Sequence, residues 1–369
     1  MAKQKQKENI RLDAFFNQMP DLGASDLHLK ADNPPLFRVD GSLHRAKSEA
    51  LSGDQIESLV GELLGSEMMA ELFEKGSVDL GRDVAGGRVR INVFLQKGRV
   101  GLVARMLEDY IPTLEELHLP DALERIVDIK QGLFLVCGIT GSGKSTSLAS
   151  LINLINKRHR YHILTIEDPI EYLHHDEKSI VNQREIGLDC QSWEDGLRAG
   201  VREDPDVILV GEMRDQETFH AGLVAAETGH LVFGTLHTSS AAGTIGRILD
   251  LFPTERHSLI RQSLAFNVQG ILCQKLVPSF REDISVVPAV ELMFTNASIR
   301  QAIEEGEDER INDLIGVGTQ EDMKTWTDSF VEIIQAGYVE KKVAMQYAPN
   351  KDALAMALRG IDVAKPSIG

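Results

Sequence analysis

Apolar residues follow two different patterns along this chain, one before and one after about residue 110. In the first hundred residues they alternate with polar residues, as at 88–96 and 99–107. An alternation with period two is typical of antiparallel strands that bury one face. The pair Asp40-Gly41 predicts the turn of a hairpin at 36–43. We therefore expect the N-terminal part to be a small α+β domain.

Two helices and a linker complete this part of the chain. We expect one helix from about residue 10 to 19, ending before Pro20 because proline disrupts a helix interior, and another at 53–75. The segment 108–120 contains prolines and charged residues but few glycines, and we interpret it as a linker. The predicted division is an N-terminal domain (1–107), the linker (108–120), a second domain with C-terminal helices (121–350), and a last helix and tail (351–369).

After residue 120 the apolar residues form continuous runs instead. Segments with a helical pattern separate these runs, which lie at 133–137, 163–166, 207–210 and 231–236. Continuous apolar runs that alternate with helices predict a mostly parallel sheet, buried on both faces. In such sheets ligands bind beyond the carboxyl ends of the strands. Polar residues at those ends are therefore the first candidates for chemistry.

A phosphate-binding loop follows the first of these runs. Residues 138–145 fit the pattern G-x-x-x-x-G-K-[ST] at every specified position, between a predicted strand and a predicted helix. The glycines let backbone N–H groups converge on an anion, and the helix N-terminus adds partial positive charge. Lys144 would reach the β- and γ-phosphates of ATP, and Ser145 would place its hydroxyl on Mg²⁺. The residues expected to bind the nucleotide here are Gly138, Thr140, Gly141, Ser142, Gly143, Lys144, Ser145 and Thr146.

Three further polar residues stand directly at the carboxyl ends of predicted strands. Glu167, Glu212 and His237 should therefore point toward the same crevice as Lys144. We interpret Glu167 as the residue that orients and activates the attacking water. Glu212 follows Gly211, which stands where many phosphate-loop ATPases carry a Mg²⁺-binding aspartate, so we place Glu212 in the outer shell of the ion. For His237, a hydrogen bond to the γ-phosphate and a structural role are both open.

Other acids and histidines lie at the amino ends of the predicted strands. Asp204 and Asp206 precede the strand at 207–210. At about 3.3 Å per residue they lie roughly 13 Å or more from Glu212, too far to share a metal ion with it. His230 also precedes its strand, and the same reasoning favours a structural role for it.

Composition narrows the class of protein further. The 369 residues carry a formal net charge of −17, which argues against a nucleic-acid partner because phosphate binding requires positive charge. The three cysteines are isolated and support neither a zinc ribbon nor a disulfide framework. The N-terminus lacks the apolar segment of a signal peptide, and no apolar run approaches the length of a membrane span. We therefore expect a soluble protein of a reducing compartment, and docking on something membrane-bound stays open.

Taken together, several blocks resemble the type II/IV secretion ATPases, and among them most closely the type IV pilus retraction motors. The resemblance extends from about Gly23 to Gly360. It rests on the segment SDLHL at 25–29, the phosphate loop, the aspartate box IEDPIEY at 166–172, VNQRE at 181–185, DPDVILVGE at 204–212 and the histidine box AETGHLVFGTLHT at 226–238.

The resemblance implies a homo-hexamer whose chains each have a PAS-like N-terminal domain and a RecA-like C-terminal domain, with ATP between the two. It implies catalytic roles for Glu167 and Glu212. It also places both His230 and His237 at or near the nucleotide, which for His230 conflicts with the argument from strand ends.

The same resemblance implies that arginines of the N-terminal domain reach the nucleotide. They correspond to Arg90 and Arg105. The third arginine of the family is replaced by Lys97, which cannot make the same two-pronged phosphate contact.

The implied function is that of a Mg-ATP-hydrolysing motor that drives pilus retraction and twitching motility. The implied partners are an inner-membrane pilus platform protein and a sister retraction ATPase. The helix that reads AIRNLIRE in retraction motors corresponds to 297–305, where Gln301, Ala302 and Glu304 depart from it. The acidic segment 304–309 that follows is either a solvated loop or a docking surface.

Two alternatives stay open at this point. One is a family member that powers assembly of a pilus or pseudopilus, or secretion. Assembly ATPases of the family usually carry a four-cysteine zinc motif, which this chain lacks. The other alternative is an accessory ATP-binding adaptor to a main motor, against which the intact Glu167 and Glu212 count.

Overall fold

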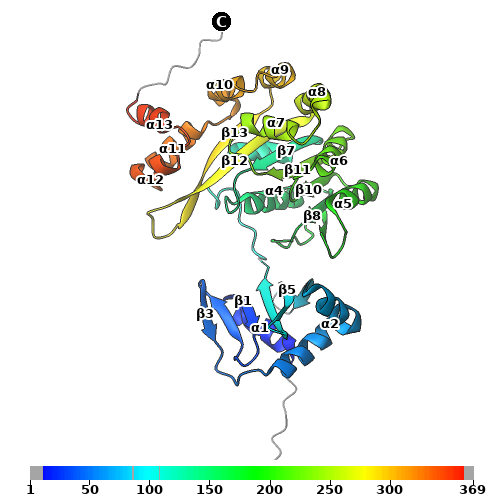
Figure 1. Ribbon diagram of the computed structural model, residues 1–369. Helices are drawn as coiled ribbons and strands as arrows, with labels where there is room; N and C mark the ends of the chain where they lie inside the picture. Colours follow the sequence, from blue (N-terminus) through cyan, green and yellow to red (C-terminus); the bar gives the residue numbers. More distant parts are fainter. Residues whose placement is uncertain (1–10, 85–86, 108, 361–369) are drawn as a thin grey trace, which may run out of the picture. The chain divides into compact units, whose positions relative to one another are not determined.

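The chain divides into two compact units, the first ending at Asp109 and the second beginning at Tyr110. The structure is a computed structural model that describes residues 11–84, 87–107 and 109–360 (Figure 1). Each unit has its own sheet and its own apolar core. The division lies within the segment 108–120 that the sequence predicts as a linker. The last part of the predicted C-terminal tail, from 361 onward, and the predicted helix start at Ile10 lie outside the described residues.

The first unit is built on a six-stranded antiparallel sheet in the order β3-β2-β1-β6-β5-β4. The predicted hairpin is confirmed: Asp40 and Gly41 join β2 to β3 with φ values of 48° and 77°, as a type I′ turn requires. The strands are β1 (Ala24–Leu29), β2 (Leu36–Val39), β3 (Ser42–Arg45), β4 (Ser77–Val84), β5 (Gly87–Gln96) and β6 (Arg99–Met106).

Two helices pack on this sheet, α1 (Leu12–Asp21) and α2 (Gly53–Lys75). The prediction that α1 ends before Pro20 is wrong, because the helix continues to Asp21. Its apolar face buries Leu12, Phe16 and Met19, and this packing retains the last turn although Pro20 contributes no N–H. Helix α2 has the predicted bounds, but Gly65 at φ 69° and ψ −177° breaks it into two helical segments.

The second unit is built on a seven-stranded sheet in the order β13-β12-β7-β11-β10-β8-β9 (Figure 1). Neighbouring strands are parallel except β12 and β13, which pair antiparallel. Every residue of β7, β10 and β11 is buried, which explains the continuous apolar runs. The strands are β7 (Gly132–Cys137), β8 (His162–Glu167), β9 (Ile180–Glu185), β10 (Val207–Val210), β11 (Leu231–Leu236), β12 (Val268–Pro278) and β13 (Val286–Phe294).

Helices connect and cover these strands. Directly after the linker, a 3₁₀ turn over Asp121–Leu123 is followed by α3. The helices are α3 (Glu124–Val127), α4 (Lys144–Arg158), α5 (Trp193–Gly200), α6 (Gln216–Glu227), α7 (Ala241–Leu249), α8 (His257–Asn267), α9 (Ala297–Glu305), α10 (Arg310–Val317), α11 (Trp326–Gln335), α12 (Lys341–Tyr347) and α13 (Lys351–Ala357). Among the described residues, no helix has both the length and the apolar character that crossing a bilayer requires.

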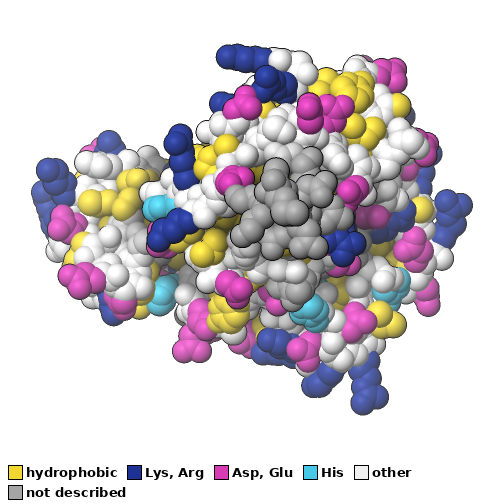
Figure 2. Space-filling view, turned by 90° about the horizontal axis from the view of Figure 1, so that it is seen from below, with side chains coloured by type: hydrophobic (Ala, Val, Ile, Leu, Met, Phe, Trp, Pro, Cys, Tyr) yellow, Lys and Arg dark blue, Asp and Glu magenta, His cyan; other side chains and the backbone are white. Residues whose placement is uncertain are grey.

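Charged side chains are distributed rather than segregated on the surface in view. Figure 2 shows Lys and Arg side chains interspersed with Asp and Glu on that face.

Within the acidic segment 304–309, Asp308 forms a two-pronged pair with Arg261 at 2.7 and 2.8 Å, and Glu307 pairs with Arg310. Part of this acidic charge is therefore neutralised inside the same unit.

Candidate active site

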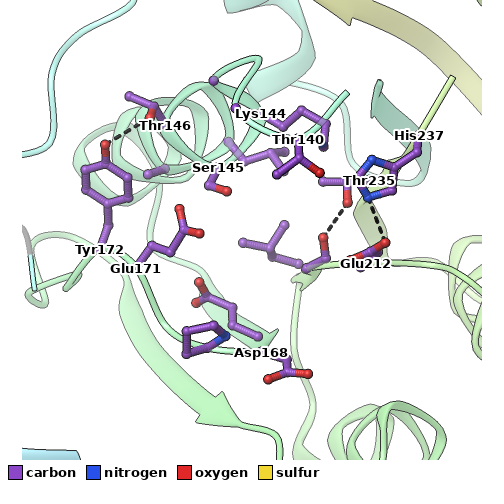
Figure 3. Close-up of a pocket in the computed structure, with 18 of the residues that line it drawn as sticks. Thr140, Lys144, Ser145, Thr146, Asp168, Glu171, Tyr172, Glu212, Thr235 and His237 are labelled. Carbon is purple, nitrogen blue, oxygen red and sulfur yellow. Dashed lines mark hydrogen bonds and ion pairs between the residues drawn. The ribbon is translucent and has the colours of Figure 1, made fainter. Parts of the chain in front are cut away.

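A cavity of about 570 Å³ lies at the carboxyl ends of the adjacent parallel strands β7, β11, β10 and β8 (Figure 3). Strand direction brings the residues predicted from these four ends to one place, because parallel strands end at the same edge of the sheet. The predicted residues that line the cavity are Thr140, Gly141, Gly143, Lys144, Ser145, Thr146, Glu167, Glu212 and His237.

The phosphate loop depends on its glycines for steric reasons. Gly138 has φ 152°, and a Cβ there would lie 2.4 Å from Ser142 Oγ and 2.5 Å from the Gln274 carbonyl oxygen. Gly143 has φ 87°, and its Cβ would lie 2.8 Å from Gln274 Nε2. The Gln274 carbonyl oxygen excludes a side chain at Gly138, and the positive φ disfavours one at Gly143. Gly138 and the buried Ser142 therefore shape the loop, while Thr140, Gly141 and Gly143 line the cavity.

The loop leads into α4, which begins at Lys144. Lys144 Nζ donates to the carbonyl oxygens of Gly138 at 2.9 Å and Ile139 at 3.2 Å. Burial lowers the pKa of Lys144 from its ordinary value, although the carboxylate of Glu212 acts in the opposite direction. Ser145 is exposed at the first turn of the helix and extends into the cavity (Figure 3). The helix N-terminus with these two side chains is suited to bind phosphate.

Glu167 ends β8 and is anchored from inside the protein. Its Oε1 accepts hydrogen bonds from Thr165 Oγ1 at 2.6 Å and from Gln183 Nε2 at 3.1 Å. Burial raises the pKa of Glu167 to about 7, against the opposing effect of these hydrogen bonds. A carboxylate with that pKa is suited to accept a proton near neutral pH.

Glu212, two residues after the end of β10, has a different environment. Its Oε1 contacts His237 Nε2 at 2.8 Å, and it forms an ion pair with Arg214 (Figure 3 draws the contact with His237). Burial raises the pKa of Glu212, but the hydrogen bonds and charges of Arg214 and His237 outweigh burial and hold the pKa below its ordinary value. The two carboxylates of the site therefore differ, one titrating near neutrality and one staying ionised, a pattern typical of acid–base sites.

The structure does not bring His230 into this group. His230 precedes β11, at the edge of the sheet opposite His237. Its Nδ1 donates to the Ala225 carbonyl oxygen at 2.9 Å, and its own carbonyl oxygen accepts from Gly132 N at 3.0 Å. Asp206 likewise accepts from the backbone N–H of His162 at 2.9 Å. These contacts agree with the argument from strand ends.

The arginines suggested for nucleotide contact lie in the first unit and have ion-pair partners there. Arg105 Nε lies 2.7 Å from Oδ1 of the buried Asp26. Arg90 lies 3.7 Å from Asp79. Lys97 occupies the turn between β5 and β6 at φ 52°. Their contact with a nucleotide stays a prediction.

Several residues of the site were not assigned a role from the sequence. Glu171 and Tyr172 line the cavity from the segment after β8, and Figure 3 shows Glu171 extending into the same space as Ser145. Tyr172 OH lies 2.9 Å from Thr146 Oγ1. Arg214 also lines the cavity, two residues after Glu212. For Glu171 and Arg214 a signal existed, since each is a charged residue within four positions of a strand-end glutamate.

Comparison with known proteins agrees with this geometry. Residues 102–344 match the family model described as Type II/IV secretion system protein. The chain belongs to this family. The resemblance proposed from the motifs is thereby confirmed.

Individual family members match most of the chain. The type IV pilus retraction ATPase PilT of Pseudomonas aeruginosa is 40% identical over 88% of this chain and 94% of its own length. The type IV pilus ATPase PilU of the same organism is 34% identical over 95% of this chain and 92% of its own. A crystal structure of the pilus retraction motor PilT with bound ADP superposes with a TM-score of 0.86 at 42% identity, covering 94% of this chain and 99% of that one. The predicted fold class, an N-terminal α+β domain followed by a RecA-like α/β domain, is confirmed.

Proposed function

We infer that this chain is an ATP-hydrolysing motor that drives retraction of type IV pili. The observation that carries this inference is the match, over nearly the whole chain, to proteins named as retraction ATPases and motors. The cavity supports it, because a glycine loop at a helix N-terminus and two strand-end carboxylates are the groups that ATP hydrolysis to ADP and phosphate requires.

The phosphates would lie on the loop amides between residues 138 and 146, with Lys144 close to the β- and γ-phosphates. Mg²⁺ fits this site, because the ion usually binds through one or two protein oxygens together with phosphate oxygens and water. The exposed hydroxyl of Ser145 supplies such an oxygen at the cavity wall. When bound, the ion neutralises phosphate charge.

Glu167 would hold the attacking water and accept its proton. Its anchored Oε1 keeps the carboxylate in one orientation, and positioning of this kind is a main source of catalysis in phosphoryl transfer. Glu212 would hold His237 and Arg214 at the far side of the cavity. From there His237 can donate a hydrogen bond to the γ-phosphate.

The finer features of the motor follow the family resemblance. We propose a cytoplasmic hexamer docked on an inner-membrane pilus platform protein. Arg90 and Arg105 are proposed, from the same resemblance, as further contacts of the phosphates. The existence of PilU as a second related ATPase supports a sister ATPase as a further partner, and nucleic acid is not expected as a partner.

The test is pilus retraction in cells whose only retraction-type ATPase is this chain. Retraction that disappears with Glu167→Gln would support a self-sufficient motor. No retraction by the unaltered chain, despite ATPase activity in vitro, would overturn that proposal and favour an accessory motor. The departures Gln301, Ala302 and Glu304 on α9 make the second outcome a specific alternative.

A further inference from the structure

Gln183, on the edge strand β9, uses its whole amide group to connect two parts of the site. Its Nε2 donates to Glu167 Oε1 at 3.1 Å and to the Tyr172 carbonyl oxygen at 2.9 Å. Its Oε1 accepts from the backbone N–H of His174 at 2.8 Å. The reverse orientation of the amide would place Oε1 against two acceptor oxygens, so the contacts themselves determine which way the amide points.

The first of these contacts restricts the Glu167 carboxylate. Strands β8 and β9 are parallel neighbours with Thr165 opposite Gln183 in register, so both side chains reach the same oxygen of Glu167. The backbone N–H of Glu171 also favours the ionised form of this carboxylate. With two donors on one oxygen, rotation of the carboxylate costs hydrogen bonds to a charged group, which are among the stronger ones in proteins.

The other two contacts restrict the segment 171–174. This segment carries Glu171, which lines the cavity, and Tyr172, whose hydroxyl contacts Thr146 in the first turn of α4. A single side chain thus links the carboxylate at the end of β8 to the segment that contacts the phosphate-binding helix.

We propose that Gln183 is a positioning residue for hydrolysis, one that holds the Glu167 carboxylate and the segment 171–174 in the arrangement that the attacking water requires. This proposal rests on the proposed function and extends it. Gln183 itself is not among the residues that line the cavity, so it acts through Glu167.

A positioning role through hydrogen bonds to the charged form has a consequence for titration. Donors to a carboxylate favour its ionised form, and the Gln183 contact lowers the pKa of Glu167 against the larger effect of burial, which raises it. Loss of the donor should therefore raise that pKa. The charged and titratable groups around it are Glu171 in the segment after β8, Glu185 opposite it on β9 and, along the same cavity, Lys144, Asp168, Tyr172, His174, Glu212, Arg214 and His237.

The decisive variant is Gln183→Glu, which keeps the side-chain length but replaces the donating amide by an oxygen. We expect kcat for ATP to fall by about tenfold to hundredfold, while the Kd for a fluorescent ATP analogue changes by less than about threefold. The acidic limb of the pH–rate profile should move to higher pH by about one unit. The matched control is Asn182→Asp, the same chemical change one residue earlier, at an exposed side chain that contacts His162 instead. The control should leave all three quantities unchanged.

Two further measurements keep the outcomes distinct. Gln183→Met, checked by thermal unfolding, removes the amide without adding charge and should also lower kcat and move the limb. If Glu167→Gln retains turnover in the same assay, the proposed role of Glu167 fails and this proposal fails with it. If Glu167→Gln abolishes turnover while Gln183→Glu and Gln183→Met keep the kcat and acidic limb of the unaltered protein, only the positioning proposal is overturned.

Discussion

The two edges of the seven-stranded sheet carry similar side chains in different arrangements. At the amino edge, Asp206 accepts a hydrogen bond from a backbone N–H of β8, and His230 donates one to a backbone carbonyl oxygen of α6. At the carboxyl edge, Glu167, Glu212 and His237 line one cavity. Glu212 follows β10 and contacts His237, which follows the neighbouring strand β11. The difference teaches that residue type alone does not mark a functional site in this fold.

Strand direction and helix polarity explain the difference. In a parallel sheet, the loops after the strands lead into helix N-termini, where partial positive charge and free N–H groups attract anions. The loops before the strands instead follow helix ends, where the polar side chains complete turns. Substitutions at the two edges should therefore have effects of very different size.

The largest effect is expected for Glu167→Gln at the carboxyl edge. Loss of a positioned general base should lower ATP turnover by about 10²- to 10⁴-fold. Nucleotide affinity should change little, because the loop and Lys144 remain. Steady-state ATPase rates and equilibrium nucleotide binding check both parts, and turnover within about twofold of the unaltered protein would contradict the assignment.

A second large effect is expected for Lys144→Ala. The ammonium group is held at the loop by two carbonyl oxygens, close to where phosphate charge would lie. Its removal should weaken ATP binding by about tenfold or more and lower turnover as well. Titration with a fluorescent nucleotide separates this variant from Glu167→Gln, which should bind normally. Equal affinities for the two variants would count against the assigned roles.

The pH dependence of kcat/KM distinguishes the two carboxylates of the same edge. Glu167 must be ionised to accept a proton, and its pKa is about 7. Activity should therefore be lost as pH falls through about 7, by about tenfold per unit below it. Glu212, whose pKa is held below its ordinary value, should stay ionised over this range. A flat profile between about pH 5.5 and pH 8 would refute this acid–base assignment.

The smallest effect is expected at the amino edge, for His230→Ala. Loss of its hydrogen bond to the Ala225 carbonyl oxygen should reduce the free energy of unfolding by about 1 kcal/mol. Turnover per folded molecule should stay within about threefold. Thermal unfolding and ATPase assays on the same sample measure both. A large loss of turnover with normal stability would instead support the family's placement of this histidine at the nucleotide.

Much of the site was predictable because it depends on local sequence and strand direction. The phosphate loop is one continuous segment, and Glu167, Glu212 and His237 each follow a run of apolar residues. Strand order was not needed to bring them together, because all parallel strands end at one edge. The same reasoning placed Asp206 and His230 at the other edge.

Other features depended on contacts between distant segments. Gln183 belongs to the block VNQRE at 181–185, but the sequence does not reveal its role. That role arises only when β9 pairs with β8 and the segment between these strands folds against the Gln183 amide. Pro20 stays inside α1 because the core holds the helix, although local preference predicts an end. Local preference and strand polarity thus sufficed for the fold class and the main carboxylates. The pKa of Glu167 and the partners of Glu212 required the folded protein, because burial and hydrogen bonding arise only when separate strands pack together.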